Sequence, residues 1–172
     1  HKAMQSGRAM NVLYLSSETF VNQFISAIGD GELDRFRFKY RNVDILLIDD
    51  IHLLANKERT QDEFFHTFNA LYNAGRQIVL SSDSPPAEIP TLKDRLISRF
   101  KWGLVAEIAT PGYETRLAIL RRKAEARGIE VPEEVLGFLA ENIDTNIREL
   151  EGAITKVVGY AQLIHKPIDI DL

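Results

Sequence analysis

The sequence predicts an α/β domain built on a parallel sheet, followed by a small all-helical lobe. Short apolar runs alternate with helical patterns through the first two thirds of the chain, which is typical of βαβ units. One of these runs, residues 45–48, ends at two adjacent carboxylates, Asp49 and Asp50. Only helical patterns remain in the last third. We therefore place the α/β core at residues 1–110 and the helical lobe at residues 111–172.

Four apolar runs are expected to form the strands of the sheet. An interior strand of a parallel sheet is covered on both faces, so a continuous apolar run such as residues 45–48 fits that position. The expected strands are residues 11–15, 43–49, 77–82 and 104–108. The accompanying helical patterns cover residues 18–28, 33–41, 61–73 and 92–100. Thr60 and Glu63 form a capping-box pattern at the start of the third helix.

Three helices are expected in the helical lobe. The first covers residues 114–127 and ends at Gly128, and the second begins at Pro132. Asn146, followed three residues later by Glu149, is a capping signal for the third helix. The apolar positions of this third helix keep helical spacing: Ile147, Leu150, Ile154, Val157, Val158, Ala161 and Ile164.

The composition excludes several classes of protein. The chain has 172 residues, of which 45% are hydrophobic and 27% charged, as in an ordinary globular protein. It has no cysteine, which excludes disulfides and thiolate metal sites. A net charge of −4 argues against a uniformly basic duplex-DNA binder, so contact with nucleic acid requires a local patch. No run of 18 apolar residues and no signal peptide occur, so we expect no membrane segment and a cytoplasmic location.

The adjacent carboxylates Asp49 and Asp50 point to a cation or phosphate site. Charges at the end of an apolar strand are tolerated where the strand emerges, and the carboxyl edge of a parallel sheet is where ligands bind. In the Walker B pattern one carboxylate holds Mg²⁺ and its neighbour orients a water molecule. The alternative is structural, because Asp is also a favoured N-cap residue for a helix that follows a strand. The local pattern leaves both interpretations open.

Eight segments together resemble one family, the bacterial replication initiator DnaA, in its AAA+ ATPase domain. They are SETF (17–20), LLIDDI (46–51), ANKER (55–59), EFFHTFN (63–69), DRL (94–96), SRF (98–100), WGL (102–104) and NIRELEGA (146–153). They occur in family order over essentially the whole chain. The pair Asp49 and Asp50 separates the sequence from the wider AAA+ class, whose Walker B strand usually ends in Asp-Glu. The resemblance implies a P-loop-type parallel sheet flanked by helices, a small helical lid, and an ATP-switched domain that assembles on the origin and opens the duplex.

The resemblance also implies roles for individual residues around the nucleotide, which would be ATP or ADP with Mg²⁺. Asp49 would hold the metal, and Asp50 would position or activate the attacking water. Asp83 would be the sensor 1 residue. Arg99 would be an arginine finger that reaches the nucleotide of a neighbouring subunit, and Arg95 belongs to the same motif. Arg148 would be the sensor 2 arginine. The position of Arg148 is compatible with a ligand contact, because it lies off the apolar stripe in a first helical turn, where the macrodipole disfavours a cation.

A further set of residues is implied for DNA. By the resemblance, Lys57 and Arg59 would touch single-stranded DNA inside a filament of initiator copies, with Ile25 at the apolar position paired with them. The implied partners are further copies of the chain, single-stranded origin DNA and other replication-initiation proteins. Basic and aromatic residues also alternate over residues 35–41, which as a strand would form a nucleic-acid platform. As a helix the same residues would pack their rings beneath the sheet, and the resemblance favours the helix.

The phosphate-binding loop of the family does not occur in this sequence. A Walker A loop needs a Gly-x-x-x-x-Gly-Lys-Ser/Thr run, whose backbone N–H groups and lysine cradle the phosphates. Residues 1–10 resemble the tail of the helix that follows this loop, so we expect the sequence to be part of a longer chain. The duplex-reading C-terminal domain of the family does not occur either. The family is a slow ATPase, but ATP hydrolysis and duplex recognition are not assigned to this chain from its sequence.

Two other function classes stay open at this level. The first is a non-catalytic interaction module that has kept the fold and lost the phosphate loop. The second is a Mg²⁺-dependent phosphoacceptor domain, which also uses an acidic pair on a doubly wound sheet. Such a domain needs a separate acceptor aspartate and a lysine at the strand ends, and it has no helical lobe. The sequence offers Asp83 but no suitable lysine, and it has the lobe.

Overall fold

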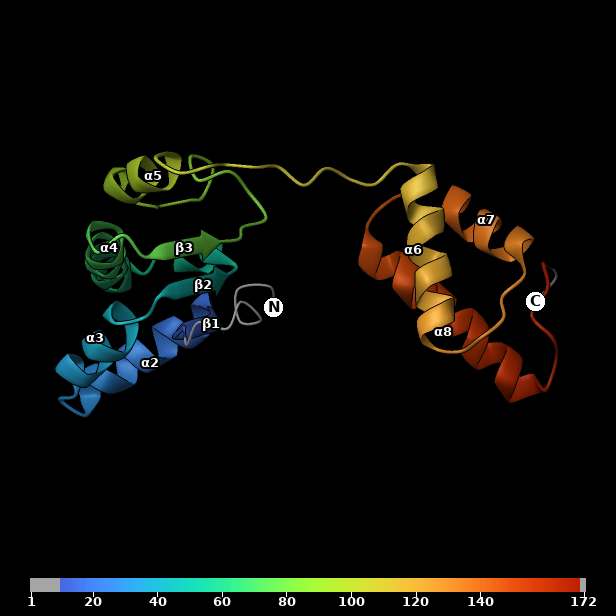
Figure 1. The fold of residues 1–172 in the computed structure, drawn as a ribbon, viewed down its shortest axis with the longest axis horizontal. Coiled ribbons are helices and arrows are strands. Elements are labelled where there is room, and N and C mark those ends of the chain that lie inside the picture. The colour runs from blue at the N-terminus through green and yellow to red at the C-terminus, as the bar shows by residue number, and fades with distance from the viewer. Residues whose placement is uncertain (1–9, 171–172) are drawn as a thin grey trace. The chain divides into compact units, whose positions relative to one another are not determined.

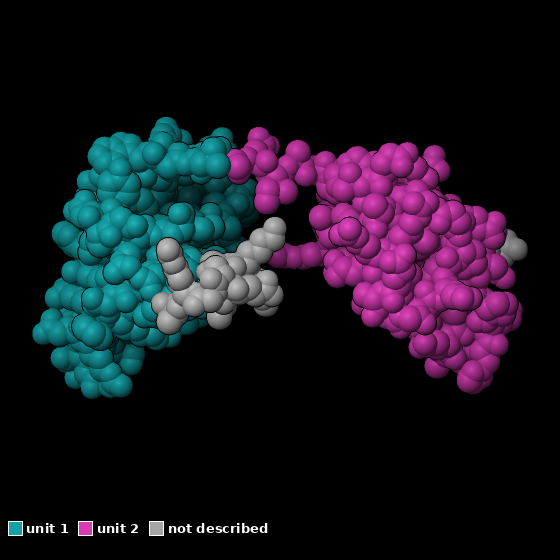
Figure 2. Space-filling view, in the orientation of Figure 1, with its two compact units in different colours: residues 1–105 teal, residues 106–172 magenta. Residues whose placement is uncertain are grey.

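The computed structural model describes residues 10–170 and divides into two compact units, which span residues 1–105 and 106–172 (Figure 2). Each unit has its own hydrophobic core. The sequence predicts the boundary after residue 110, whereas the structure places it slightly earlier, after residue 105. None of the helices within residues 10–170 combines the length and the apolar content that crossing a lipid bilayer requires.

Within the described residues, unit 1 is built on a parallel sheet with the strand order β1-β2-β3 (Figure 1). Val12 of β1 pairs with Ile45 of β2, which pairs with Gln77 of β3. The strands are β1 (Val12–Ser16), β2 (Ile45–Asp49) and β3 (Gln77–Leu80). The helices are α2 (Ser17–Gly29), α3 (Leu33–Arg41), the 3₁₀ turn η1 (Ile51–Leu54), α4 (Glu58–Asn73) and α5 (Asp94–Lys101). The predicted α/β class with a parallel sheet is confirmed.

Aromatic side chains of α2, α3 and α4 form the core over one face of the sheet. Phe20 packs edge-to-face against Tyr40 and Phe64, with ring centroids 4.9 Å and 5.5 Å apart. Phe36 and Tyr40, one turn apart on α3, are 5% and 0% exposed. Residues 35–41 therefore lie in a helix with a buried aromatic face, and the alternative of a basic strand platform is wrong.

Within unit 1, the described helices cover only one face of the sheet. Leu46 and Ile48 of β2 are buried, whereas Leu47 between them is only partly buried. On this second face Leu47 pairs in register with Tyr14 and Val79, which are 67% and 46% exposed. The expectation that β2 is buried on both faces is therefore wrong for the described part of the chain, because α2, α3 and α4 pack against the other face.

The strand predicted at residues 104–108 is absent. These residues have no regular secondary structure, and Leu104 and Ile108 are both 96% exposed. A strand needs a neighbour that satisfies its backbone hydrogen bonds. No strand among residues 10–170 pairs with this segment, so its apolar run has no sheet to join.

The capping box predicted at Thr60 and Glu63 is also wrong. Helix α4 begins at Glu58, so both residues lie inside the helix, where they are buried. The Glu63 carboxylate accepts hydrogen bonds from Arg37 at 3.0 Å and from Arg41 at 2.5 Å. Glu63 therefore joins α3 to α4 instead of capping its own helix.

Unit 2 consists of α6 (Tyr113–Ala126), α7 (Glu133–Asn142) and α8 (Ile147–Ile164) within the described residues. Their buried faces meet around Leu120, Ala140 and Leu150. The Asn146 side chain accepts a hydrogen bond from the Glu149 N–H at 2.8 Å, as the capping signal predicts. Gly128 follows α6 with φ +64°, a conformation that glycine adopts without steric cost. The predicted helical lobe is confirmed.

Candidate functional site

The acidic pair lies at the point where β2 leaves the sheet. Asp49 is the last residue of the strand, and Asp50 follows with φ 57° and ψ 49°, in the left-handed region. This conformation is uncommon for a non-glycine residue, although Asp tolerates it better than most. The residue after β3 fixes the turn, because Ser81 accepts hydrogen bonds from the Ile51 N–H at 2.8 Å and, through its side chain, from the Asp50 N–H at 3.2 Å. Asp50 is exposed, and no N-cap hydrogen bond from its side chain to η1 occurs.

Two hydroxyl groups position the Asp49 carboxylate. The Tyr14 hydroxyl of β1 donates to Asp49 Oδ2 at 3.2 Å, and the Ser81 hydroxyl, just after β3, donates to Oδ1. The hydrogen bond to Asp49, together with the negative charge of that carboxylate, raises the pKa of Tyr14. Groups from three neighbouring strands therefore meet at the carboxyl edge of the sheet. Sequence analysis identified Asp49 but missed both hydroxyl donors.

Asp83, the predicted sensor 1 residue, lies on the loop after β3 and contacts the η1 turn. Its carboxylate Oδ1 lies 3.1 Å from Nδ1 of His52, a residue of η1. The Asp83 side chain is 68% exposed, whereas His52 is 23% exposed. His52 thus links the sensor candidate to the turn that follows Asp50. Histidine spacing gave no signal for this contact, because it depends on the register between β2 and β3.

The carboxyl edge of the sheet could hold Mg²⁺ only if phosphate oxygens of a nucleotide supplied some of the metal's ligands. Among residues 10–170 no three His, Cys, Asp or Glu side chains gather as a metal cage. Mg²⁺ is commonly held by one or two carboxylates together with the phosphates of a nucleotide and several waters. The hydrogen-bonded carboxylate of Asp49 is a donor of this kind, and Asp50 is its sequence neighbour.

Arg95, on the first turn of α5, is engaged within its own unit. Its guanidinium is paired with the Asp62 carboxylate of α4, which also binds Lys93. The hydrogen bond from Lys93 lowers the pKa of Asp62, and the charges of Lys93 and Arg95 act in the same direction. The Arg95 guanidinium also lies 4.5 Å from the centre of the Phe65 ring.

The other two candidate arginines have no carboxylate partner among the described residues. Arg99 of α5 stacks on Trp102, with its guanidinium carbon 4.3 Å from the ring centroid. Arg148, the second residue of α8, is exposed, and its guanidinium makes no hydrogen bond or ion pair within residues 10–170. Arg99 belongs to unit 1 and Arg148 to unit 2.

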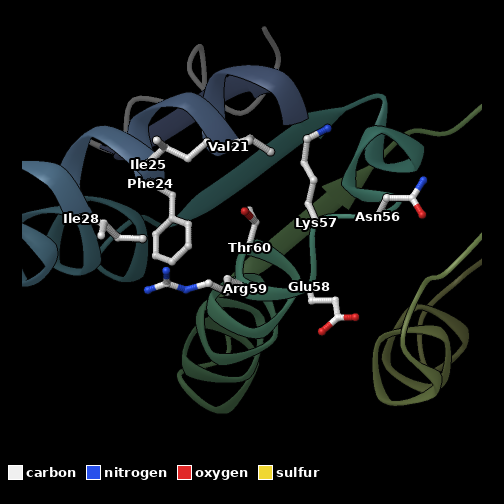
Figure 3. A pocket seen from close by; sticks show the side chains of 9 residues that line it. All are labelled: Val21, Phe24, Ile25, Ile28, Asn56, Lys57, Glu58, Arg59 and Thr60. Carbon is white, nitrogen blue, oxygen red and sulfur yellow. The ribbon is translucent and has the colours of Figure 1, made fainter.

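The three predicted DNA-contacting residues line one groove, with a volume of about 510 Å³ (Figure 3). One wall is the outer surface of α2, where Ile25 is 59% exposed. The other wall is the start of α4, from which Lys57 and Arg59 project (Figure 3). The complete lining is Val21, Phe24, Ile25, Ile28, Asn56, Lys57, Glu58, Arg59 and Thr60. Arg59 makes no ion pair within residues 10–170, and the Lys57 ammonium donates to the Leu53 carbonyl at 2.8 Å.

A buried glutamine fixes the turn that presents these cations. The Gln61 amide donates to the Leu54 carbonyl at 2.9 Å and accepts from the Lys93 N–H at 3.0 Å. The Asn56 N–H donates to the Thr91 hydroxyl at 2.6 Å, and Asn56 itself has φ 60°. The start of α4 is therefore tied to the segment before α5. No sequence pattern identified Gln61, because polar residues inside a helix are usually solvated.

The structure has a parallel sheet, an acidic pair at the carboxyl end of β2, a polar loop after the adjacent strand and a separate helical unit. This is the arrangement of the AAA+ fold of the P-loop type. Residues 1–107 match the model of the bacterial DnaA ATPase domain, and the chain belongs to this family of replication initiators. The family assignment decides against the phosphoacceptor interpretation.

Solved structures of replication initiators resemble the chain closely. Domain III of the replication initiation protein DnaA from Thermotoga maritima is 45% identical, with a TM-score of 0.94 over 98% of this chain and 71% of that one. AMPPCP-bound DnaA from Aquifex aeolicus is 39% identical, with a TM-score of 0.82 over 91% of this chain. A DnaA structure bound to AMPPCP and single-stranded DNA gives the same identity, score and coverage. The chain spans 48% of each of these two AMPPCP-bound proteins.

Proposed function

We propose that this chain is the module through which a replication initiator binds ATP or ADP with Mg²⁺ and assembles on origin DNA in the cytoplasm. The observation that carries the proposal is the Asp49 carboxylate, held at the carboxyl edge of the sheet by hydroxyl groups from both sides. Ligands of open parallel sheets bind at this edge. The AMPPCP-bound relatives support a nucleotide as the ligand.

The three acidic residues have different roles at the nucleotide. Asp49 holds Mg²⁺, which when bound neutralises charge on the phosphates. Asp50, turned out of the strand by its left-handed backbone, positions the attacking water. Asp83 acts as the sensor 1 residue, and His52 restrains its loop through the 3.1 Å contact.

The arginines act at two different nucleotides. Arg99 is the finger that reaches the nucleotide of a neighbouring copy, and Arg148 is the sensor 2 residue that acts within its own chain. Both have no carboxylate partner within residues 10–170, so their donors are available for phosphate oxygens. Arg95 can offer a nucleotide the guanidinium N–H groups that its bond to Asp62 leaves uncommitted.

The groove between α2 and α4 binds single-stranded DNA in the assembled protein. Lys57 and Arg59 contact phosphates, while Ile25 supplies an apolar wall. Each subunit makes few contacts, so affinity arises from many subunits bound in register along one strand. The relative bound to single-stranded DNA supports this assignment. Other replication-initiation proteins are the remaining expected partners.

The test is a titration of the full-length protein with ATP, with and without Mg²⁺. Asp49→Asn keeps the side-chain shape and removes its charge, so we expect Mg²⁺ to stop strengthening ATP binding in that variant. Asp34→Asn, at a fully exposed carboxylate of α3, is the matched control and should behave like the wild type. A full-length protein that assembles on single-stranded DNA but binds no ATP would instead support the non-catalytic interaction module.

A further inference from the structure

Arg99 lies between two aromatic rings on the surface formed by α4 and α5. Its guanidinium carbon is 4.3 Å from the centre of the Trp102 ring and 5.8 Å from that of Phe65. Trp102 is 61% exposed, although tryptophan is usually well buried. Its ring also packs against Tyr72 of α4, at a centroid distance of 5.7 Å. An exposed tryptophan stacked on a partly buried arginine requires an explanation other than core packing.

The stack has a clear local origin. Arg99 lies in the last turn of α5 and Trp102 caps that helix, with the Trp102 N–H donating to the Arg99 carbonyl at 3.2 Å. The three-residue spacing places both side chains on one side of the helix end. Arg95 lies one turn earlier on the same side, and Asp62 offsets the repulsion between the two cations.

The two arginines of α5 are restrained in chemically different ways. Arg95 uses an N–H group to bind the Asp62 carboxylate, and its guanidinium carbon lies 4.5 Å from the centre of the Phe65 ring. The Arg99 guanidinium carbon instead lies over the Trp102 ring, whose π surface attracts a cation. A ring attracts the charge without taking a carboxylate's place at the N–H groups, so the planar fork of donors that recognises phosphate oxygens stays available.

We propose that Trp102 is a positioning residue for Arg99. It orders the guanidinium in the unassembled chain without occupying its hydrogen-bond donors, so that less side-chain entropy is lost when Arg99 meets an anionic group of a neighbouring copy. The role rests on the proposed function of Arg99 as a finger that acts in trans. Phe65 supplies the second, more distant face of the same arrangement.

The contact between Arg99 and Trp102 is tested by NMR on the 172-residue chain. The ring current of Trp102 should move the Arg99 side-chain protons upfield, and Trp102→Leu should return them toward the positions of an unstacked arginine. The chain contains one tryptophan, so its fluorescence gives a second readout, which Arg99→Ala should change. Unchanged Arg99 shifts in the Trp102→Leu variant would overturn the proposal.

The role is tested by ATP-dependent assembly of the full-length protein, in a double-mutant cycle of Trp102→Leu and Arg99→Ala. We expect Trp102→Leu to weaken assembly by about two- to fivefold, the range that an exposed cation–π contact supports. Trp102→Phe keeps a ring and should recover part of that loss. At protein concentrations high enough for Arg99→Ala still to assemble, Trp102→Leu should have no further effect in the Arg99→Ala background. Phe38→Leu, at a 72% exposed ring of α3, is the matched control.

The outcomes separate failure of the positioning role from failure of the proposed function. If Trp102→Leu weakens assembly equally with and without Arg99, Trp102 contacts the neighbouring copy directly, and the positioning role is overturned. Normal assembly of Trp102→Leu together with failed assembly of Arg99→Ala would overturn the positioning role alone. Normal assembly of Arg99→Ala would overturn the finger assignment, and the positioning role with it.

Discussion

At the scale of single residues, the Asp49 carboxylate is positioned by groups that are distant in the sequence. Tyr14 and Ser81 reach it from the strands on either side, and His52 approaches Asp83 across the same edge. The acidic residues could be predicted because a polar end to an apolar strand is a local signal. Their partners could not, because these contacts depend on the register of β1, β2 and β3.

The groove residues give a prediction at this scale. In the full-length protein assembled with ATP, Arg59→Ala should weaken single-stranded DNA binding by roughly fivefold, or about 1 kcal/mol, because one charge-assisted phosphate contact is lost. The salt dependence of binding should become less steep for the same reason. Fluorescence anisotropy with a labelled oligonucleotide at several salt concentrations measures both effects.

The control is Arg122→Ala, an exposed cation of unit 2, which should leave strand binding unchanged. ATP binding and assembly should be normal in all of these variants. If the doubly substituted Lys57→Ala, Arg59→Ala protein binds the strand as the wild type does, the groove between α2 and α4 is not the DNA site.

At the scale of helices and strands, local patterns succeeded where the element supplies its own interactions. The α8 cap follows from Asn146 alone, whereas at residues 35–41 the local pattern allowed a strand or a helix and the family resemblance favoured the helix that the structure shows. Prediction failed where the outcome depends on a distant partner. Residues 104–108 have the pattern of a strand but no pairing neighbour among residues 10–170, and Glu63 binds α3 instead of capping α4.

The junction of α3 and α4 gives a stability prediction. Glu63→Gln should lower the free energy of unfolding by about 1–3 kcal/mol, because Arg37 and Arg41 lose their shared carboxylate. The loss stays below that of a fully buried pair, because both arginines are partly exposed. The midpoint of urea unfolding measures it. Glu32→Gln, which breaks an exposed pair with Arg35, is the control and should cost less than about 0.5 kcal/mol.

The contact between α2 and α3 gives a prediction for alkaline pH. Burial raises the pKa of Tyr40 to about 12, and its hydroxyl donates to Gln23 at 2.7 Å. The folded state therefore favours the neutral phenol, so this contribution to stability is complete below pH 10 and is lost as the pH rises through about 12. Unfolding measured between pH 9 and pH 12 should show this loss in the wild type.

Tyr40→Phe should remove that part of the alkaline loss, at the cost of about 0.5–1.5 kcal/mol near neutral pH for the missing hydrogen bond. Tyr160→Phe, at an exposed tyrosine of unit 2, is the control and should retain the alkaline loss. An identical alkaline profile for Tyr40→Phe and the wild type would show that another group causes the loss.

At the scale of the whole molecule, the candidate residues are divided between two units and, by proposal, between two copies. The acidic pair and Arg99 belong to unit 1, whereas Arg148 belongs to unit 2. A net charge of −4 gives the chain no general affinity for DNA, so in the proposed function single strands bind through the grooves of assembled copies. Nucleotide binding, assembly and DNA binding are therefore separable in variants.

The arginines provide the last prediction, in the full-length protein. Arg148→Ala should weaken the response of a single subunit to nucleotide. Arg99→Ala should leave the nucleotide affinity of the monomer nearly intact and weaken ATP-dependent assembly far more than Trp102→Leu does, because a finger acts on the nucleotide of a neighbour. Nucleotide titration of dilute monomer and sedimentation of the assembled protein distinguish the two.

Mixing two inactive variants tests action in trans directly. Arg99→Ala subunits keep the acidic site but lack the finger, whereas Asp49→Asn subunits keep the finger but lack the metal ligand. If Arg99 acts across a junction, the mixture contains junctions in which an intact finger meets an intact acidic site, and assembly-dependent ATPase activity should reappear. If Arg99 acts within its own chain, no subunit of the mixture has both parts, and the mixture should be as inactive as either variant alone.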